Sequence, residues 1–185
     1  KLLENALHIK DRNLTYSEDI QEKTLYYPKE IEGEISKLYE YLEKDNLEAI
    51  QSRLVEKAMP KGVCIMLYGK PGTGKTETVY QLAKKTGRAI FHVDIGNTIS
   101  HWMGGTVNNL KQVFEKYEQL CEQLKSRGEE IPILLFNEAD ALFGKRIEPP
   151  RQGCEVDENH TQSFLLDSIE KQEGIIIATT NLAGN

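Results

Sequence analysis

The segment that most constrains the fold is a glycine-rich loop, Gly69–Thr76, with the sequence GKPGTGKT. It follows a short apolar run at residues 63–67 and precedes a stretch with helical character from Lys75 to Lys85. A phosphate-binding loop requires this order of strand, loop and helix. Glycines let successive backbone N–H groups turn inward into an anion-binding nest, and the positive end of the following helix faces the same point. The loop therefore predicts a site for the phosphates of a nucleotide.

Two side chains of this loop predict specific contacts. The Lys75 ammonium is placed to reach the β- and γ-phosphates, and the Thr76 hydroxyl is placed to hold Mg²⁺. The residues that we expect to contact the nucleotide are Gly69, Pro71, Gly72, Thr73, Gly74, Lys75, Thr76 and Glu77.

The rest of the chain alternates between strand and helix patterns. Strands are predicted at 63–67, 89–94, 131–136 and 175–181, and amphipathic helices lie between them. Such alternation is typical of an α/β fold with a parallel sheet. We divide the chain into residues 1–60, an approach segment with two helices packed on the core, and residues 61–185, the nucleotide-binding core. Residues 1–30 are interpreted as a polar docking segment, and residues 144–158 as a polar loop.

A second candidate feature lies at the end of the run Ile131–Phe136, which is apolar enough for a strand buried on both faces. This run places Asn137 and Glu138 at its carboxyl end, where open α/β sheets hold their chemistry. Hydrolysis of a phosphoanhydride needs a group that orients or deprotonates water, and Glu138 is the best candidate. The alternative is an acid that is merely solvated at a strand end.

Composition narrows the classes of partner. The net charge is −6, which provides no bulk attraction for nucleic acid or for an anionic membrane surface. No apolar run approaches the roughly 20 residues that span a bilayer. Three widely spaced cysteines favour reduced thiols in a cytoplasmic protein. The four histidines have no metal-ligand spacing, so we do not expect zinc.

With these motifs in order, the sequence resembles the AAA family of ATPases over roughly residues 60–185. Gly69–Thr76 resembles its Walker A motif, Leu134–Asp140 its Walker B motif and Thr179–Asn181 its sensor 1 element, with Asn181 in the sensor position. The resemblance implies a P-loop NTPase fold, a three-layer sandwich with a central parallel sheet. It also implies ATP or ADP and Mg²⁺ as ligands, with Glu138, Lys75 and Asn181 as catalytic residues and Thr76 and Asn137 at the metal.

The resemblance extends to the substrate and to the assembly. Ser100–Gly105 resembles the pore loop of the family, which would give Trp102 and Met103 contact with a polypeptide substrate. Trp102 could instead be an ordinary core residue. The family relation implies a homo-oligomeric ring, usually a hexamer, that remodels or unfolds proteins. We expect no nucleic-acid partner and no membrane partner.

One residue departs from the family pattern. The usual first acidic residue of the Walker B pair is aspartate, and here it is Asn137. An amide keeps the acceptor oxygen but removes a negative charge beside the cation, so we expect binding to survive and hydrolysis to persist.

Other family parts do not follow Asn181. The C-terminal strand, the helical lid and the arginine finger would lie beyond Asn185, and Arg146 and Arg151 are only weak substitutes. We therefore expect a longer protein, and weak ATPase activity from this stretch alone.

Two other readings remain open. The first is a nucleotide-gated assembly switch or binding module with little turnover. The second is a clamp-loader or DNA-remodelling member of the same superfamily, which the acidic charge disfavours.

Overall fold

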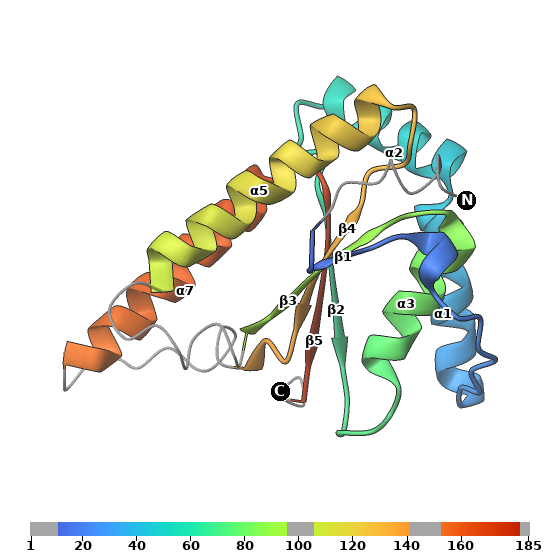
Figure 1. Cartoon of the computed structure of the whole chain (residues 1–185), viewed down its shortest axis with the longest axis horizontal. Helices are drawn as coiled ribbons and strands as arrows, with labels where there is room; N and C mark the ends of the chain where they lie inside the picture. Colours follow the sequence, from blue (N-terminus) through green and yellow to red (C-terminus); the bar gives the residue numbers. More distant parts are fainter. Residues whose placement is uncertain (1–10, 96–105, 141–152, 182–185) are drawn as a thin grey trace.

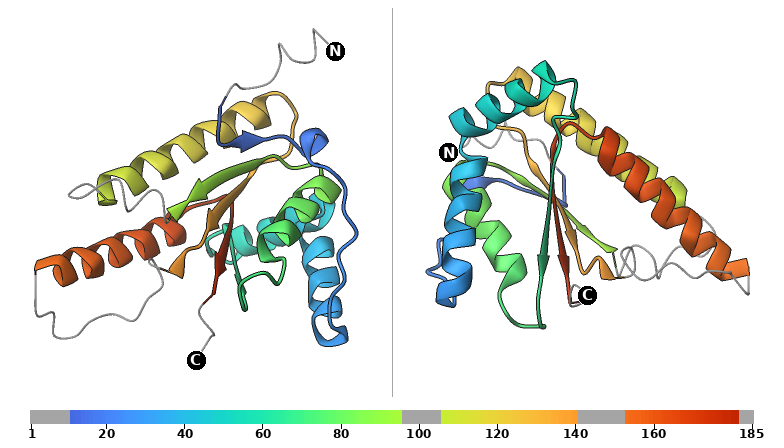
Figure 2. Two further views of the ribbon diagram at one scale, coloured as in Figure 1. Left: turned by 60° about the horizontal axis from the view of Figure 1, so that its bottom comes forward. Right: turned by 180° about the vertical axis from the view of Figure 1, so that it is seen from behind.

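The computed structural model describes residues 11–95, 106–140 and 153–181, which form a five-stranded sheet with helices on both faces (Figures 1 and 2). The order across the sheet is β1-β3-β4-β5-β2. The strands are β1 (Leu14–Thr15), β2 (Val63–Tyr68), β3 (Ile90–Asp94), β4 (Ile133–Asn137) and β5 (Ile175–Thr180). The pairs β3–β4, β4–β5 and β5–β2 are parallel, and β1 pairs with β3 in the antiparallel sense. The predicted α/β sandwich is confirmed, with a mostly parallel sheet.

The helices divide between the two faces. On one side lie α1 (Lys29–Leu42), α2 (Lys44–Glu56) and α3 (Lys75–Thr86), and on the other lie α5 (Thr106–Ser126) and α7 (Gly153–Lys171) (Figure 1). A short 3-10 turn, η1 (Ser17–Asp19), lies between β1 and α1. The polar loop predicted over 144–158 is wrong at its end, because α7 already begins at Gly153. Residues 144–152 lie outside the described residues.

The central strands are apolar throughout because both of their faces are covered. In β4, Leu134 and Phe136 pack with α5 and α7, whereas Ile133 and Leu135 pack with the helices of the opposite face. Alternate side chains of a strand point to opposite sides, so a strand between two helix layers needs no polar positions. Asn137 therefore lies at the carboxyl end of a strand whose preceding residues are all buried.

The N-terminal segment is more deeply integrated than its polar composition predicted. Leu14, Tyr16 and Ile20 are buried in the core, and the two residues of β1 extend the sheet beyond β3. The interpretation of residues 1–30 as a surface docking segment was therefore wrong for this part. Three apolar side chains spaced along a polar stretch form no periodic pattern, so local sequence does not reveal them.

Among the described residues, β2 forms the other edge of the sheet. Its side chains Cys64, Met66 and Tyr68 are exposed, although the apolar run at 63–67 predicts a buried strand. The described parts of α5 and α7 cover β3, β4 and β5 but leave this face of β2 open. None of the described helices combines the length and apolar character needed to cross a bilayer.

Candidate functional site

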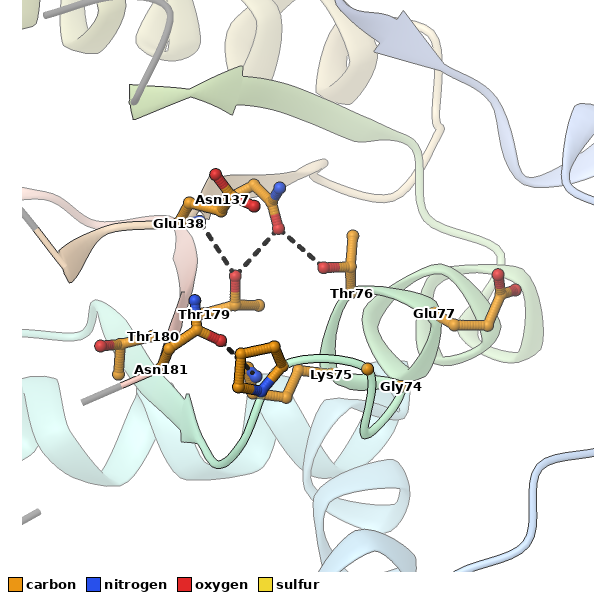
Figure 3. Close-up of a pocket in the computed structure, with 11 residues that line it drawn as sticks. Gly74, Lys75, Thr76, Glu77, Asn137, Glu138, Thr179, Thr180 and Asn181 are labelled. Carbon is orange, nitrogen blue, oxygen red and sulfur yellow. Dashed lines mark hydrogen bonds between the residues drawn. The ribbon is translucent and has the colours of Figure 1, made fainter. Parts of the chain in front are cut away.

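The loop between β2 and α3 forms one wall of a cavity of about 330 Å³ (Figure 3). Gly72 and Gly74 have φ of 76° and 85°, in the left-handed region that favours glycine. Gly74 immediately precedes the first residue of α3, so the chain enters the helix with its free N–H groups at this wall. The residues that border the cavity are Pro71, Gly72, Gly74, Lys75, Thr76, Glu77, Asn137, Glu138, Thr179, Thr180 and Asn181.

Lys75 lies at the centre of the site and is fully engaged. Its Nζ donates to the carbonyl oxygens of Gly69 and Lys70, at 2.8 and 3.0 Å, and to Oδ1 of Asn181 at 2.9 Å. An ammonium group has three N–H donors, so these three acceptors satisfy it. The positive charge is thus held between the loop and the tip of β5.

Asn137 joins the loop to the sheet. Its Oδ1 accepts hydrogen bonds from the Thr76 hydroxyl at 2.7 Å and from the Thr179 hydroxyl at 2.9 Å (Figure 3). The amide oxygen therefore lies within hydrogen-bond distance of the Thr76 hydroxyl. Since the Thr76 hydroxyl proton points to Asn137, the lone pairs of its oxygen remain available to a cation.

Glu138 follows directly and has an unusual backbone. Its φ is 53°, in the left-handed region, and its side chain is exposed at the cavity. Its backbone N–H donates to the Thr179 hydroxyl at 3.2 Å, and the N–H of Ala139 donates to the Thr179 carbonyl at 2.9 Å. Left-handed backbone at a non-glycine residue is uncommon and clusters at functional sites.

Asn181 is anchored behind the cavity by an acidic residue that the sequence analysis did not single out. Its backbone N–H donates to Asp140 Oδ1 at 2.7 Å, and its Nδ2 donates to Asp140 Oδ2 at 3.2 Å. The Thr180 hydroxyl donates to the same carboxylate. Thr179 and Asp140 are the site residues that sequence reasoning missed. The available signal was their position, because both are polar residues at the ends of apolar strands.

Glu77 borders the cavity, but its carboxylate turns away from Lys75 and Thr76 (Figure 3). Lys23 donates to it at 2.7 Å and Gln81 at 2.8 Å. The hydrogen bond from Lys23 lowers the pKa of Glu77 below its ordinary value, and the bond from Gln81 acts in the same direction against partial burial. The expected contact of Glu77 with the nucleotide would therefore involve its backbone.

The remaining predicted residues fall into two groups. Gly69 and Thr73 shape the loop without bordering the cavity, since the Gly69 carbonyl accepts from Lys75 and the Thr73 hydroxyl donates to the Lys70 carbonyl at 2.8 Å. Trp102 and Met103 lie outside the described residues.

The described residues contain no cluster of three or more histidine, cysteine, aspartate or glutamate side chains suited to a metal ion. At the start of α3, the Thr76 hydroxyl and the Asn137 amide oxygen lie 2.7 Å apart and are two neutral oxygens that a cation could use. Neutral oxygens of this kind suit a hard cation that keeps several of its waters, as Mg²⁺ does.

Comparison with known proteins agrees with this geometry. The model of the family described as "ATPase family associated with various cellular activities (AAA)" matches residues 65–185. The ATPase family gene 2 protein of Schizosaccharomyces pombe is 31% identical over 66% of this chain and 14% of its own length.

Two further proteins are similar to this chain over a comparable stretch. The vesicular-fusion protein SEC18 of Candida albicans is 27% identical over 61% of this chain and 14% of its own length. The 26S proteasome regulatory subunit 7 homolog of Schizosaccharomyces pombe is 30% identical over 62% of this chain and 23% of its own length. The chain thus spans a quarter or less of these relatives. The family match covers most of the chain and agrees with a cavity bordered by the glycine-rich loop, the end of β4 and the tip of β5, so the chain belongs to the AAA family of ATPases.

Proposed function

We propose that this chain binds ATP and hydrolyses it with Mg²⁺ as the nucleotide-binding core of an oligomeric AAA protein. The observation that carries the proposal is the convergence of Lys75, Thr76, Asn137, Glu138 and Asn181 on one cavity. A phosphate cradle, a cation, and a water-orienting acid are the parts that phosphoryl transfer to water needs. These residues come from the start of α3 and from the ends of β4 and β5, so chance proximity is a poor explanation.

Phosphate binding is assigned to the loop and to Lys75. The backbone N–H groups at the start of α3 and the Lys75 ammonium present positive charge to the cavity. Because the three donors of Lys75 are already used, phosphate binding requires that it exchange at least one of its present acceptors.

The oxygens of Thr76 and Asn137 would hold Mg²⁺, Asn137 through a bound water. Their 2.7 Å hydrogen bond orients the hydroxyl proton away from the cation. When bound, the cation neutralises charge on the phosphates and helps to align them. Asn137 accepts from two hydroxyl groups as an aspartate would, but without the full negative charge.

Glu138 is proposed as the group that orients the attacking water and accepts its proton. Its carboxylate is exposed at the cavity, and its backbone is fixed by the Thr179 hydroxyl. Asn181, at the neighbouring strand end, is proposed to act beside the γ-phosphate. Both roles belong to positions that border the same space as Lys75.

A second candidate function is a nucleotide-gated switch with little turnover. Asn137 favours it, because an amide in place of a carboxylate weakens the electrostatic support for a divalent cation. The two functions differ in turnover and agree in nucleotide binding.

The deciding experiment is steady-state Mg²⁺-ATP hydrolysis by the full-length protein beside its Glu138→Gln and Asn137→Asp variants. We expect turnover in the parent, loss of about 100-fold or more in Glu138→Gln, and unchanged or faster turnover in Asn137→Asp. Glu173→Gln is the matched control, since Glu173 is exposed and pairs with Lys61 away from the cavity. ATP binding without turnover in the parent, restored by Asn137→Asp, would establish the switch instead.

Protein remodelling by a hexameric ring is the finer part of the proposal, and it is supported by family membership. Trp102 and Met103 are proposed to grip a polypeptide. Trp102→Ala should then preserve ATP binding and reduce remodelling by the assembled protein, and equal loss of both would contradict it. A reducing compartment such as the cytoplasm is proposed because Cys64 and Cys121 carry free thiols.

A further inference from the structure

The side-chain amide of Asn181 has two chemically different ends, and both are used. Its Oδ1 accepts from Lys75 at 2.9 Å, and its Nδ2 donates to Asp140 Oδ2 at 3.2 Å. If the amide rotated by half a turn, its N–H₂ group would face the Lys75 ammonium, so two donors would oppose each other. Whatever decides the orientation of this amide therefore decides whether an acceptor faces Lys75.

Asp140 fixes the orientation of the Asn181 amide. An ionised carboxylate only accepts hydrogen bonds, so the amide must turn its Nδ2 toward it. The same carboxylate also accepts from the backbone N–H of Asn181 at 2.7 Å and from the Thr180 hydroxyl. Three donors from two consecutive residues thus bind one acidic group, and hydrogen bonds to an ionised group are among the stronger ones.

The buried tip of β5 stabilises this orientation of the Asn181 amide. Thr180 and Thr179 are each only 2% exposed, so the tip of β5 is buried up to Asn181. Asp140 reaches this tip from the turn after β4, three residues beyond Asn137. Lys75, the Asn181 amide and Asp140 form a chain in which a positive and a negative group polarise the amide between them.

We propose that Asp140 is a positioning residue for ATP hydrolysis, which holds the Asn181 amide with its oxygen toward Lys75. This inference rests on the proposed ATPase function and deepens it. Asp140 acts through Asn181 and is not among the residues that border the cavity. Its loss should therefore lower turnover while ATP binding, which depends on the loop and Lys75, is retained.

The test compares Asp140→Asn, Asn181→Ala and the double variant in the full-length protein, with ATP affinity and kcat measured separately. Misplacement of a catalytic group by about 1 Å can cost on the order of 100-fold. We expect kcat to fall about 10- to 100-fold in Asp140→Asn, with the ATP dissociation constant changed less than about threefold. The double variant should be no slower than Asn181→Ala alone, since both changes remove one arrangement.

The matched control is Asp167→Asn, an exposed aspartate of α7 that pairs with Lys171 at 2.7 Å and should leave kcat unchanged. Parental kcat in Asp140→Asn, or losses that multiply in the double variant, would overturn the positioning role while the ATPase function stands. Absence of turnover in the parent would overturn both. Should Asp140→Asn fail to fold, Asp140→Glu moves the carboxylate by one methylene and enters the same comparison with Asn181→Ala.

Discussion

At the scale of single residues, the site depends on two adjacent positions at the end of β4. Asn137 supplies an oxygen that accepts from two threonine hydroxyls, so the substitution of amide for carboxylate preserves the geometry. Glu138 is held at φ 53° by the hydrogen bonds that its own N–H and that of Ala139 donate to Thr179. The surrounding fold offsets the strain of this backbone conformation, and the conformation directs the carboxylate to the cavity.

A stability measurement can test this conformation. The left-handed region costs an ordinary residue roughly 1–2 kcal/mol, and asparagine tolerates it better. Glu138→Asn should therefore be more stable to urea than Glu138→Gln, by a fraction of that amount, and both should lose ATP turnover. Equal stability of the two variants would mean that the residue does not adopt the left-handed conformation in solution.

At the scale of elements, polar contacts tie helices to strands at places with no obvious sequence signal. Arg88 is only 1% exposed and donates to the carbonyl of Leu42 at 3.1 Å and to that of Ile131 at 3.0 Å. It also pairs with Glu130 at 3.2 Å. Buried arginines are tolerated when paired in this way. The end of α1 is thereby held beside the start of β4, and the division of the chain at residue 60 stays a prediction.

The end of α2 offers an element-scale prediction. Ala58 has φ 54° just after the helix, and the N–H of Met59 donates to the Leu54 carbonyl at 2.9 Å. Glycine is preferred at such a left-handed helix end. Ala58→Gly should raise the free energy of unfolding by about 0.5 to 1 kcal/mol.

Its control is Ala49→Gly, at an exposed position inside the same helix. Glycine there should lower stability by about 0.5 to 1 kcal/mol. Chemical denaturation of both variants supplies the comparison, and a loss of stability in both would contradict a left-handed Ala58.

At the scale of the whole molecule, the N-terminal segment crosses α3 and links distant parts of the chain. Besides the ion pair between Lys23 and Glu77, the backbone N–H of Lys23 donates to Gln81 at 3.0 Å. The Tyr27 hydroxyl lies 3.0 Å from that of Thr78, whereas Tyr26 is 92% exposed. Neither tyrosine is among the residues that border the cavity.

The pKa of Glu77 makes this attachment sensitive to acid. Because the hydrogen bond from Lys23 lowers the pKa of Glu77 in the folded state below 4.5, its stabilising contribution is complete above that pH. The contribution is lost as the pH falls through the lowered folded value. Glu77→Gln should therefore flatten the decline in unfolding free energy below about pH 4.5, measured by urea denaturation at several pH values. Lys23→Met should flatten it as well, and an unchanged slope in both would show that the pair forms no such link.

Local pattern alone determined the phosphate loop, the apolar central strands and the polar residues at their carboxyl ends. Lys75, Thr76, Asn137, Glu138 and Asn181 could be placed near one another because parallel strands end at one edge of a sheet. The apolar faces of the helices could also be predicted, because apolar residues recur about every 3.6 residues within each helical segment.

Only the tertiary structure decided which of those polar tips touch. The pairing of β4 with β5 brings Asp140 to Asn181 and Thr179 to Asn137 over about 40 residues of chain. The burial of Leu14 and Tyr16 and the exposure of Cys64 were equally nonlocal. Each depends on which helix covers which strand. A short segment encodes its own period but not its neighbours, so contacts between segments arise only when strand order and layer coverage are set.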